Sequence, residues 1–452
     1  MASDPSPLDP ALVTRLRAIS SAERRSFTDR TSASQAWLAQ AREAMPSGVP
    51  APWMAGLYSH DPVVATSGSG TRFTDLDGHS YIDFNLCDLA MAAGFASPPI
   101  VEAVSRQVAI GNHFLLPVED ALEVSRLLTQ RFGLPQWQFT LSASGANVDA
   151  LRLARAFTGR RTVVVFGAKY HGHLEEMMWE AGKPEALGLA PQSGEDVVTV
   201  PFNDLLELER ALSSGDVAAV LTEPVLTNCG LVLPQPNFHD EMRRLCSDAG
   251  ALLVIDETHT QFAKYGGGTL TFDLSPDLMT GGKGIGGGVP IGVIGMSDAL
   301  AAYAADHIES DYSHEPGVAG GGTLYGNALS LAAARAGLSE VFTPDAHEHV
   351  EELGDRLQQG LQWLIDARGL PFTIDRWGGR SQWRLTPEAP VTGADGYLST
   401  DRDFATARRL YFLNRGVWDA IATSGPGISF AAEDKDVDIY LEVAASFLDA
   451  LL

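Results

Sequence analysis

The stretch from residue 251 to residue 288 constrains the fold more than any other part of the chain. Residues 251–255 (Ala-Leu-Leu-Val-Ile) form an apolar run without alternation, which is typical of a parallel strand that is buried on both faces of a sheet. Asp256 follows directly, so the strand ends in an acid at the edge where open α/β sheets bind their ligands. The same residues also fit a buried strand whose acid only caps a helix.

A glycine-rich segment with a single lysine follows this strand. Residues 279–288 read Met-Thr-Gly-Gly-Lys-Gly-Ile-Gly-Gly-Gly, and Lys283 is one of five lysines in the chain. A lysine amine in its neutral form can make a Schiff base with an aldehyde, and an acid such as Asp256 can keep a pyridinium nitrogen protonated. The pair therefore indicates pyridoxal phosphate (PLP) chemistry, and a flexible surface loop is the alternative interpretation.

Strands and helices alternate from about residue 137 onward. The predicted strands are residues 138–141, 162–166, 197–200, 217–222, 252–255 and 291–294. Predicted helices lie between or after them, at residues 148–157, 238–249 and 328–342. This alternation predicts an α/β fold with a mostly parallel central sheet flanked by helices.

The chain length of 452 residues allows two or three domains. We expect a large domain that binds the cofactor and a smaller α/β domain made from the N- and C-terminal segments. The expected parts are a loose N-terminal arm or short helix (1–35), an N-terminal segment of the small domain (36–95), the large domain (96–335) and the C-terminal small domain (336–452).

Composition excludes several kinds of partner. The formal net charge of −25 argues against nucleic acid and anionic membrane surfaces, because binding to phosphates needs basic patches. No apolar stretch approaches the length of a membrane span, and the first residues carry no basic segment followed by an apolar one. The three cysteines are widely spaced, so we expect a reduced, cytoplasmic protein.

Two motifs follow the first strands of the alternating region. Residues 141–147 (Leu-Ser-Ala-Ser-Gly-Ala-Asn) open a helix, where backbone N–H groups favour a phosphate, although the motif by itself favours a plain helix cap with a tight turn. Tyr170 and His171 follow the next strand, where an aromatic ring could stack on a planar cofactor or simply line a loop. His171 and His173 lack a third ligand at suitable spacing, so we expect no metal site.

Two further motifs carry an acid and a hydroxyl. Glu223 ends another predicted strand and is followed by Pro224, which restricts the backbone before it. Residues 320–327 (Gly-Gly-Gly-Thr-Leu-Tyr-Gly-Asn) form a second glycine-rich loop, in which the hydroxyl of Thr323 suits an anion. Each motif is weak by itself, and their order around Asp256 and Lys283 is the stronger signal.

In this order the motifs resemble the class III (omega) aminotransferase family of fold-type I PLP enzymes, near its glutamate-1-semialdehyde aminomutase branch. The resemblance covers roughly residues 46–441. It implies that Lys283 bonds to the cofactor aldehyde, that Asp256 pairs with the pyridine nitrogen, and that Tyr170 stacks on one face of the ring. The remaining cofactor-binding positions that it implies are Ser144, Gly145, Ala146, His171, Glu223 and Thr258.

The resemblance also implies a homodimer with shared active sites. Thr323 matches a threonine that, in the family, reaches the phosphate bound by the neighbouring subunit. We therefore expect a dimer of identical chains in which each subunit completes the site of the other.

The chain departs from the family pattern near the cofactor. Ala146 stands where threonine is usual, so one phosphate hydrogen bond is expected to be lost. Thr258 and His259 replace the common Val-Met, which places polar groups beside the ring. His259 could influence the site without touching the cofactor, or it could be an ordinary polar residue of the core. We predict the second.

Other departures concern the substrate. The loop 46–52 leads to Trp53-Met54 where the aminomutase branch has an arginine, and Ser424 aligns with a glutamate of that branch. Both argue against glutamate-1-semialdehyde as the substrate. Arg380 and Arg384 are the candidates for binding a substrate carboxylate, with a solvated surface strand as the alternative. Trp53 suits an apolar substrate side chain or the core.

These residues predict a PLP-dependent aminotransferase that moves an amino group between an amine or amino acid, beta- and omega-amino acids included, and a keto acid or aldehyde. Lys283 would act as base and acid in the proton shift. The same residues also serve an aminomutase or an amino-acid epimerase without net exchange, because only the substrate pocket differs. A third interpretation is a non-catalytic binding protein with the same fold.

Overall fold

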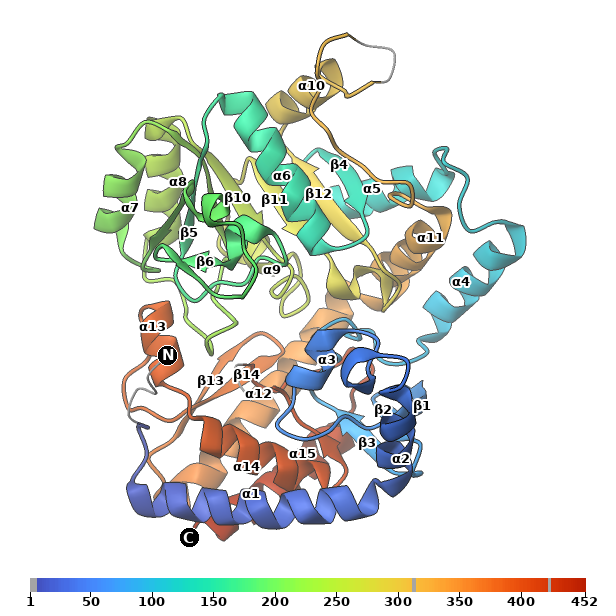
Figure 1. Ribbon diagram of the computed structural model, residues 1–452, viewed down its shortest axis with the longest axis vertical. Helices are drawn as coiled ribbons and strands as arrows, with labels where there is room; N and C mark the ends of the chain where they lie inside the picture. The colour runs from blue at the N-terminus through green and yellow to red at the C-terminus, as the bar shows by residue number, and fades with distance from the viewer. Residues whose placement is uncertain (1–5, 311–313, 422–423) are drawn as a thin grey trace. The chain divides into compact units, whose positions relative to one another are not determined.

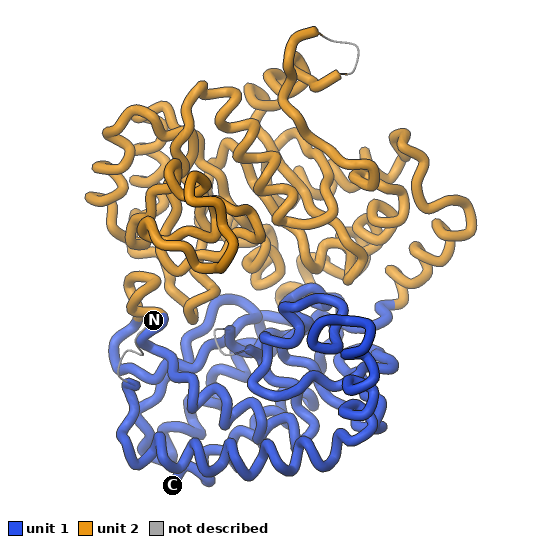
Figure 2. Tube along the Cα trace, viewed as in Figure 1, with its two compact units in different colours: residues 1–97, 349–389, 397–452 blue, residues 98–348, 390–396 orange. Residues whose placement is uncertain are grey.

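The computed structural model describes residues 6–310, 314–421 and 424–452, and it divides the chain into two compact units (Figure 2). Unit 1 contains residues 1–97, 349–389 and 397–452, and unit 2 contains residues 98–348 and 390–396.

A seven-stranded sheet forms the centre of the described part of unit 2 (Figure 1). Its strands stand in the order β4-β12-β11-β10-β9-β5-β8, and only β12 pairs antiparallel with its neighbours. The strands are β4 (Gln136–Thr140), β5 (Thr162–Phe166), β8 (Val197–Val200), β9 (Val217–Thr222), β10 (Leu252–Asp256), β11 (Leu278–Gly281) and β12 (Gly292–Met296). The predicted mostly parallel α/β sheet is confirmed.

Helices cover both faces of this sheet, as the alternation of side chains along each strand requires. On one face Val164 and Phe166 of β5 pack with residues of α7 and α8, and on the other Val163 and Val165 pack with residues of α6 and α10. The helices of unit 2 are α4 (Pro98–Ile110), α5 (Glu119–Phe132), α6 (Ala143–Thr158), α7 (Leu205–Leu212), α8 (Phe238–Ala249), α9 (Gly267–Thr271), α10 (Asp298–Asp306) and α11 (Ala328–Ala336). Both predicted helices at residues 148–157 and 238–249 are present.

Short elements complete unit 2. The strands β6 (Trp179–Glu180) and β7 (Lys183–Pro184) form a two-stranded ribbon. The short 3₁₀ segments are Glu175–Met178, Pro191–Gly194 and Lys283–Gly286, and a π-helical turn at Gly337–Val341 continues α11. Helix α12 (Pro344–Asp366) begins in unit 2 and continues in unit 1.

Unit 1 has a small sheet of its own in the order β1-β2-β3-β15 and a separate hairpin β13-β14. The strands are β1 (Ala65–Ser69), β2 (Arg72–Asp75), β3 (Ser80–Asp83), β13 (Thr373–Trp377), β14 (Arg380–Arg384) and β15 (Val417–Trp418). The helices are α1 (Pro10–Arg30), α2 (Ser32–Ala41), α3 (Pro52–Gly56), α14 (Arg402–Leu413) and α15 (Asp434–Leu451), with a 3₁₀ turn at Pro46–Gly48; α13 (Gly393–Leu398) spans the second boundary.

The structure corrects two expectations in unit 1. The segment predicted as a loose arm or a short helix contains the 21-residue helix α1, which begins at Pro10 and is capped by the side chain of Asp9. Its residues Leu16 and Phe27 are buried in two different clusters of unit 1. The sequence of residues 427–430 also has a weak strand pattern, but in the structure this segment forms only an isolated bridge between Gly427 and Arg380. Among the described residues, no helix combines the length and apolar character needed to cross a membrane.

Shortening a side chain of α1 tests whether this helix belongs to the core of unit 1. Phe27 is 1% exposed and lies 4.6 Å from the His60 ring, between centroids. Phe27→Ala should lower the free energy of unfolding of unit 1 by about 3–5 kcal/mol, because it leaves a cavity. Urea unfolding followed by tryptophan fluorescence measures this change. Arg25→Ala, at an exposed position of the same helix, should have little effect, and equal midpoints for both variants would contradict the packing.

Candidate active site

Two adjacent strands bring the predicted acid and lysine to the same edge of the sheet in unit 2. Strand β10 ends at Asp256, which lies opposite Thr280 of the parallel strand β11. Strand β11 ends at Gly281, and Lys283 follows two residues later. Because the carboxyl ends of parallel strands meet at one edge, both side chains emerge where ligands bind in such sheets.

The carboxylate of Asp256 is buried and accepts hydrogen bonds at both oxygens. His171 Nδ1 and Asn147 Nδ2 each lie 2.9 Å from Oδ2. The backbone N–H and the hydroxyl of Thr258 donate to Oδ1 at 3.0 and 2.5 Å. Burial by itself would raise the pKa of Asp256, but the hydrogen bond and charge of His171, together with Thr258 and Asn147, lower it to about 2. Asp256 is therefore ionised at neutral pH.

Lys283 lies in a backbone conformation that L-residues rarely adopt, with φ of 48°. Its neighbour Gly282 has no side chain, and a Cβ at this position would lie only 2.8 Å from the backbone nitrogen of Ala143. Gln261 Nε2 donates to the carbonyl of Gly282 at 2.8 Å. The lysine loop is thus held between helix α6 and the residues that follow β10.

The amine of Lys283 contacts His259. Lys283 Nζ lies 2.6 Å from His259 Nε2, and the other ring nitrogen of His259 lies 2.9 Å from Thr227 Oγ1. Thr227 Oγ1 donates to Glu223 Oε2 at 2.6 Å. Glu223, predicted as a cofactor-binding acid, is thereby connected to the lysine through two side chains. Burial raises the pKa of Glu223, and the charge of His171 and the hydrogen bond from Thr227 oppose this effect.

The beginning of α6 forms the candidate phosphate site. Ser142 caps the helix by accepting a hydrogen bond from the Gly145 N–H at 3.1 Å. Ser144 Oγ accepts from the His173 N–H at 3.3 Å, so it joins this turn to the loop after β5. A Cβ on Gly145 would lie 2.7 Å from the hydroxyl of Tyr325. The absence of a side chain at Gly145 therefore leaves room for close approach to the helix end.

Ala146 does not offer a polar group at this site. Its side chain is fully buried among apolar residues between α6 and the sheet, and its N–H donates to the Ser142 carbonyl at 3.0 Å. That N–H already belongs to the hydrogen bonding of the helix. A contact between Ala146 and a phosphate stays a prediction.

The remaining predicted residues of unit 2 lie at the surface or beneath the site. Tyr170 is exposed, and its ring meets the His173 ring edge-on at 6.3 Å between centroids. His171 is buried, and its Nε2 has no hydrogen-bond partner among the residues that the structure describes. Thr323 is exposed in its glycine-rich loop.

The predicted substrate residues belong to unit 1. Arg384 is buried and its donors are used within the unit: Nε contacts Asp375 at 2.8 Å and Nη1 donates to the Thr386 carbonyl at 2.7 Å. The alternative of a solvated surface strand is wrong for both arginines, since Arg380 is buried as well. Trp53, in α3, is exposed.

Three contributors to this site were missed in the sequence: Asn147, Gln261 and Thr227. Asn147 is fully buried in the first turn of α6, where its amide donates to Asp256 and to the His171 carbonyl. The signal for it was a polar residue on the apolar side of a predicted helix, which needs a partner in the core. Gln261 and Thr227 follow Asp256 and Glu223 within five residues, but their orientation depends on turns that periodicity does not reveal.

Comparison with known proteins matches most of the chain to one family. The family model for class-III aminotransferases matches residues 55–378. The chain belongs to this family. A curated relative, glutamate-1-semialdehyde 2,1-aminomutase 2 of Brevibacillus brevis, is 32% identical over 419 residues, which cover 90% of this chain and 96% of the relative.

Solved structures agree with this class-III assignment. A glutamate-1-semialdehyde aminomutase from Pseudomonas aeruginosa PAO1 superposes with a TM-score of 0.92 at 36% identity and covers 97% of this chain and 99% of its own. A beta-phenylalanine aminotransferase from Variovorax paradoxus superposes with a TM-score of 0.86 at 27% identity, covering 96% and 97%. The predicted family and fold type are confirmed.

The class-III family uses PLP, and the described side chains fit this cofactor. Asp256 offers a buried, ionised carboxylate, Lys283 an amine at the same sheet edge, and the Ser144–Gly145 turn a helix N-terminus. These are the three groups that a pyridinium, an aldehyde and a phosphate need. Within the described residues no cluster of three or more His, Cys, Asp and Glu side chains could hold a metal ion.

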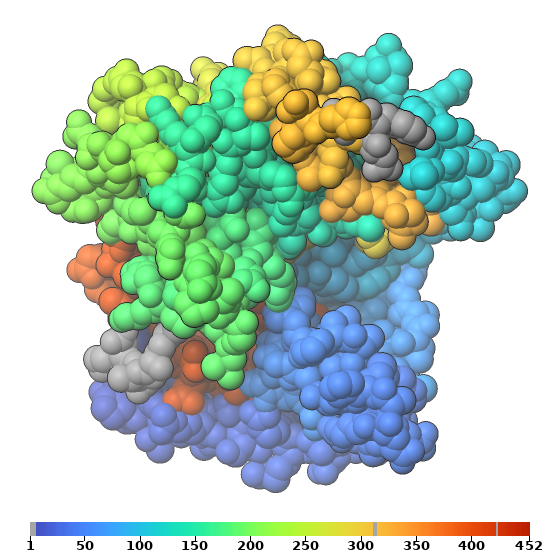
Figure 3. Space-filling view, turned by 45° about the horizontal axis from the view of Figure 1, so that its top comes forward, coloured from blue at the N-terminus to red at the C-terminus, as the bar shows by residue number. Residues whose placement is uncertain are grey.

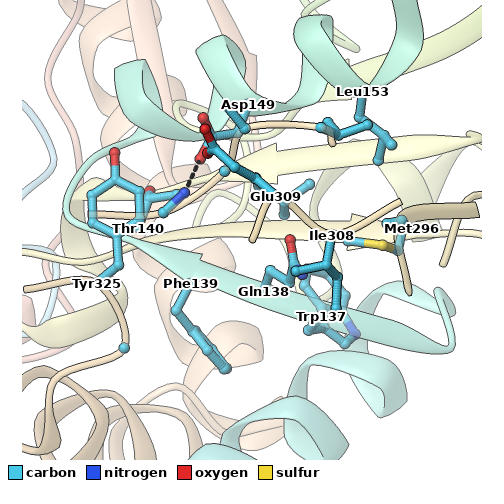
Figure 4. A pocket seen from close by; sticks show the side chains of 17 residues that line it. Trp137, Gln138, Phe139, Thr140, Asp149, Leu153, Met296, Ile308, Glu309 and Tyr325 are labelled. Carbon is cyan, nitrogen blue, oxygen red and sulfur yellow. Dashed lines mark hydrogen bonds between the residues drawn. The ribbon is translucent and has the colours of Figure 1, made fainter. Parts of the chain in front are cut away.

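A cavity of about 390 Å³ is lined by residues of β4, α6 and β12 and of the segment that follows α10 (Figure 4). Thr140 and Tyr325 line one end of it, and Asp149 accepts a hydrogen bond from the Gly321 N–H at 3.4 Å. Its lining includes neither Lys283 nor Asp256. The cavity is therefore separate from the candidate active site of this class-III enzyme.

The low pKa of Asp256 predicts a pH-dependent contribution to stability. An unfolded Asp has a pKa of about 3.9, so the folded carboxylate stabilises the protein fully above about pH 4, and this stabilisation is lost as the pH falls toward the folded pKa of about 2. Asp256→Asn should lower the free energy of unfolding by about 2 kcal/mol near pH 6 and by less near pH 3.

Urea unfolding at several pH values measures this difference. Asp240→Asn, at an exposed position of α8, is the matched control and should show no such trend. A destabilisation by Asp256→Asn that is constant with pH would contradict the low pKa.

Proposed function

We propose that this chain is a PLP-dependent aminotransferase in which Lys283 moves the proton. The observation that carries the proposal is the placement of Lys283 and the ionised Asp256 at the ends of the adjacent strands β11 and β10. When bound, PLP supplies an electron sink for the carbanion of the substrate. The amino group would pass from an amine or amino acid to a keto acid or aldehyde.

Asp256 has an electrostatic role in this proposal. A carboxylate that stays ionised while buried stabilises a positive charge within hydrogen-bond reach. It would hold a proton on the pyridine nitrogen of the cofactor. His171, Asn147 and Thr258 fix the carboxylate in place through the four hydrogen bonds described above.

The other residues bind and orient. The N-terminus of α6, with Ser144 and Gly145, would hold the phosphate. Tyr170 is exposed at the edge of the site and would stack on the ring, with Thr258 on the other face. Lys283 would take a proton from the substrate carbon as a neutral amine and return it as an ammonium ion, the two halves of a 1,3-proton shift.

An aminomutase is the second candidate, because the first curated relatives and the solved structure with the TM-score of 0.92 carry that name. Two departures support an aminotransferase with another substrate: Trp53-Met54 and Ser424 stand where the aminomutase branch has an arginine and a glutamate. Arg384 is an unsuitable carboxylate ligand because its donors already bind Asp375 and backbone carbonyls.

The absorption spectrum of the cofactor distinguishes the candidates. PLP-loaded protein mixed with a panel of amines and amino acids, with no acceptor present, should convert to the pyridoxamine form and release a keto product. Conversion followed by return of the original band, with an isomerised amine, would instead establish the aminomutase. Absence of any change with every donor would overturn both proposals and leave a binding protein.

Lys283→Ala is the control for that experiment. It should bind PLP without the band of the lysine-bound cofactor, and its turnover should fall by a factor of about 10² to 10⁴ or more, because both cofactor attachment and proton transfer depend on its amine. Lys183→Ala, at an exposed position, should leave turnover unchanged. Wild-type activity of Lys283→Ala would contradict the assignment.

We also propose that the protein is a cytoplasmic homodimer. The segment from α4 to α5, which is cyan in Figure 3, contains several large apolar side chains that are exposed. The group comprises Val101, Val108, Ile110, Phe114, Leu115, Leu116 and Leu122. Leu115 and Leu116 are 72% and 71% exposed. Apolar side chains grouped in this way favour a covering partner, and a second copy of the chain would place its exposed Thr323 near the phosphate of the first.

Charged substitutions in this segment test the dimer. The double variant Leu115→Asp/Leu116→Asp should shift the protein from twice the mass of one chain to a monomer, because burying two carboxylates in an apolar interface is costly. Sedimentation equilibrium measures the mass, and the monomer should also bind PLP more weakly. Leu187→Asp, at a fully exposed position, should remain a dimer. If the wild-type protein is a fully active monomer, both the proposed dimer and the proposed role of Thr323 at the phosphate are contradicted.

A further inference from the structure

The imidazole of His259 is in direct contact with the amine of Lys283, with 2.6 Å between Nε2 and Nζ. His259 is buried, at 7% exposure, and stands where the family commonly has methionine. In the proposed proton shift, Lys283 would take and return the substrate proton through this amine.

The second ring nitrogen of His259 leads to a carboxylate. Nδ1 lies 2.9 Å from Thr227 Oγ1, whose hydroxyl donates to Glu223 Oε2 at 2.6 Å. If Lys283 donates to Nε2, the proton of a neutral imidazole is on Nδ1 and points to Thr227. The ammonium then donates to His259, His259 donates to Thr227, and Thr227 donates to the carboxylate of Glu223.

Glu223 is surrounded by donors. Thr227 provides both its hydroxyl and its N–H, the latter at 3.2 Å, and Asn228 Nδ2 donates to the other carboxylate oxygen at 3.2 Å. This arrangement suits a carboxylate rather than a carboxylic acid. Two other charged groups change the pKa of Glu223: His171 lowers it and Asp256 raises it. Hydrogen bonds that end in a charge are stronger than those between neutral groups.

We propose that His259 is a positioning residue for Lys283, which accepts a hydrogen bond from the lysine ammonium and connects it through Thr227 to the carboxylate of Glu223. The inference rests on the proposed proton transfer by Lys283. It gives His259 two effects: it holds Nζ in one place, and it stabilises the ammonium ion that forms when the amine takes the proton from the substrate carbon.

His259 can also form a hydrogen bond with the neutral amine of Lys283. Asn228 Nδ2 lies 3.2 Å from His259 Nδ1 and can donate to it when the imidazole proton is on Nε2. His259 then donates to the lone pair of the amine. The imidazole therefore has a hydrogen-bond partner in both protonation states of Lys283, which a residue used only to fill the core does not need.

Competitive labelling of the apo-protein tests this contact without turnover. The rate at which acetic anhydride acylates Lys283 is followed over a pH series by peptide mass spectrometry. His259→Met removes the acceptor, and His259→Gln keeps one in its amide oxygen. Thr227→Val breaks the link to Glu223, and Thr227→Ser keeps it. His347→Gln changes a buried histidine whose Nδ1 contacts the Thr343 carbonyl instead.

The pH midpoint of acylation should be lower by about one unit in His259→Met than in the wild type. The reason is that losing the hydrogen bond from the ammonium destabilises it relative to the amine by about tenfold. Thr227→Val should move it in the same direction by less. His259→Gln, Thr227→Ser and His347→Gln should stay near the wild type. Equal midpoints for His259→Met, His347→Gln and the wild type would overturn the proposal.

A second measurement uses the PLP-loaded protein and an amino donor that it accepts. The rate of exchange of the donor's α-hydrogen with solvent deuterium should fall by about tenfold to a hundredfold in His259→Met, with unchanged KM, and recover in His259→Gln. An equal loss in His259→Gln and His259→Met would reduce His259 to a structural role. A shifted labelling midpoint in a protein without transferase activity would sustain the contact and reject the proposed function instead, so the two failures are distinguishable.

Discussion

The ionised carboxylate of Asp256 in the interior of unit 2 determines where several other residues must lie. A buried charge without partners costs several kcal/mol, and its partners here come from three parts of the chain: Asn147 in α6, His171 after β5, and Thr258 after β10. Each must keep its hydrogen bond for the charge to remain. The start of α6 and the loop after β5 are therefore fixed around one side chain, and these are the segments that carry Ser144 and Tyr170. The same hydrogen bonds therefore stabilise the fold and hold the residues that we propose to bind the cofactor.

The lysine is held by a different means. Its φ of 48° is unfavourable for a residue with a side chain, and such a conformation persists only where the surroundings determine it. Here Gly282 fits against the backbone of Ala143 because it lacks a Cβ, and Gln261 binds its carbonyl. The lysine loop thus rests on the same turn of α6 that begins the candidate phosphate site. Charge fixes Asp256 and steric fit fixes Lys283, so the two groups are positioned independently of a substrate.

The sequence predicted the parts of the fold that follow from periodicity. Strands β5, β8 and β9 and helix α8 agree with the predicted residues, because continuous apolar runs and a strong amphipathic pattern leave few alternatives. Strand β11 was missed, since Leu-Met-Thr-Gly is short and runs into the glycine-rich segment. Helix α1 was taken for a loose arm or a short helix because its low apolar content concealed the two residues that it buries. The acid and the lysine were predictable from type and position, whereas Asn147, Gln261 and Thr227 depend on tertiary contacts that no local pattern encodes.

The pair Thr258-His259 shows what two polar side chains at these positions require of their surroundings. As single changes from Val-Met they add two polar side chains to an interior, which is unfavourable unless each finds a partner. Thr258 donates a hydrogen bond to Asp256, and His259 contacts Lys283 and Thr227. Thr227 in turn needs Glu223. Replacing His259 with methionine alone would leave Thr227 and Lys283 with one contact fewer. Thr227 also binds Glu223, so residues 223, 227 and 259 form a set whose members constrain one another. His259 contacts Lys283 on one side and Thr227 on the other, which supports the proposal that it positions the lysine.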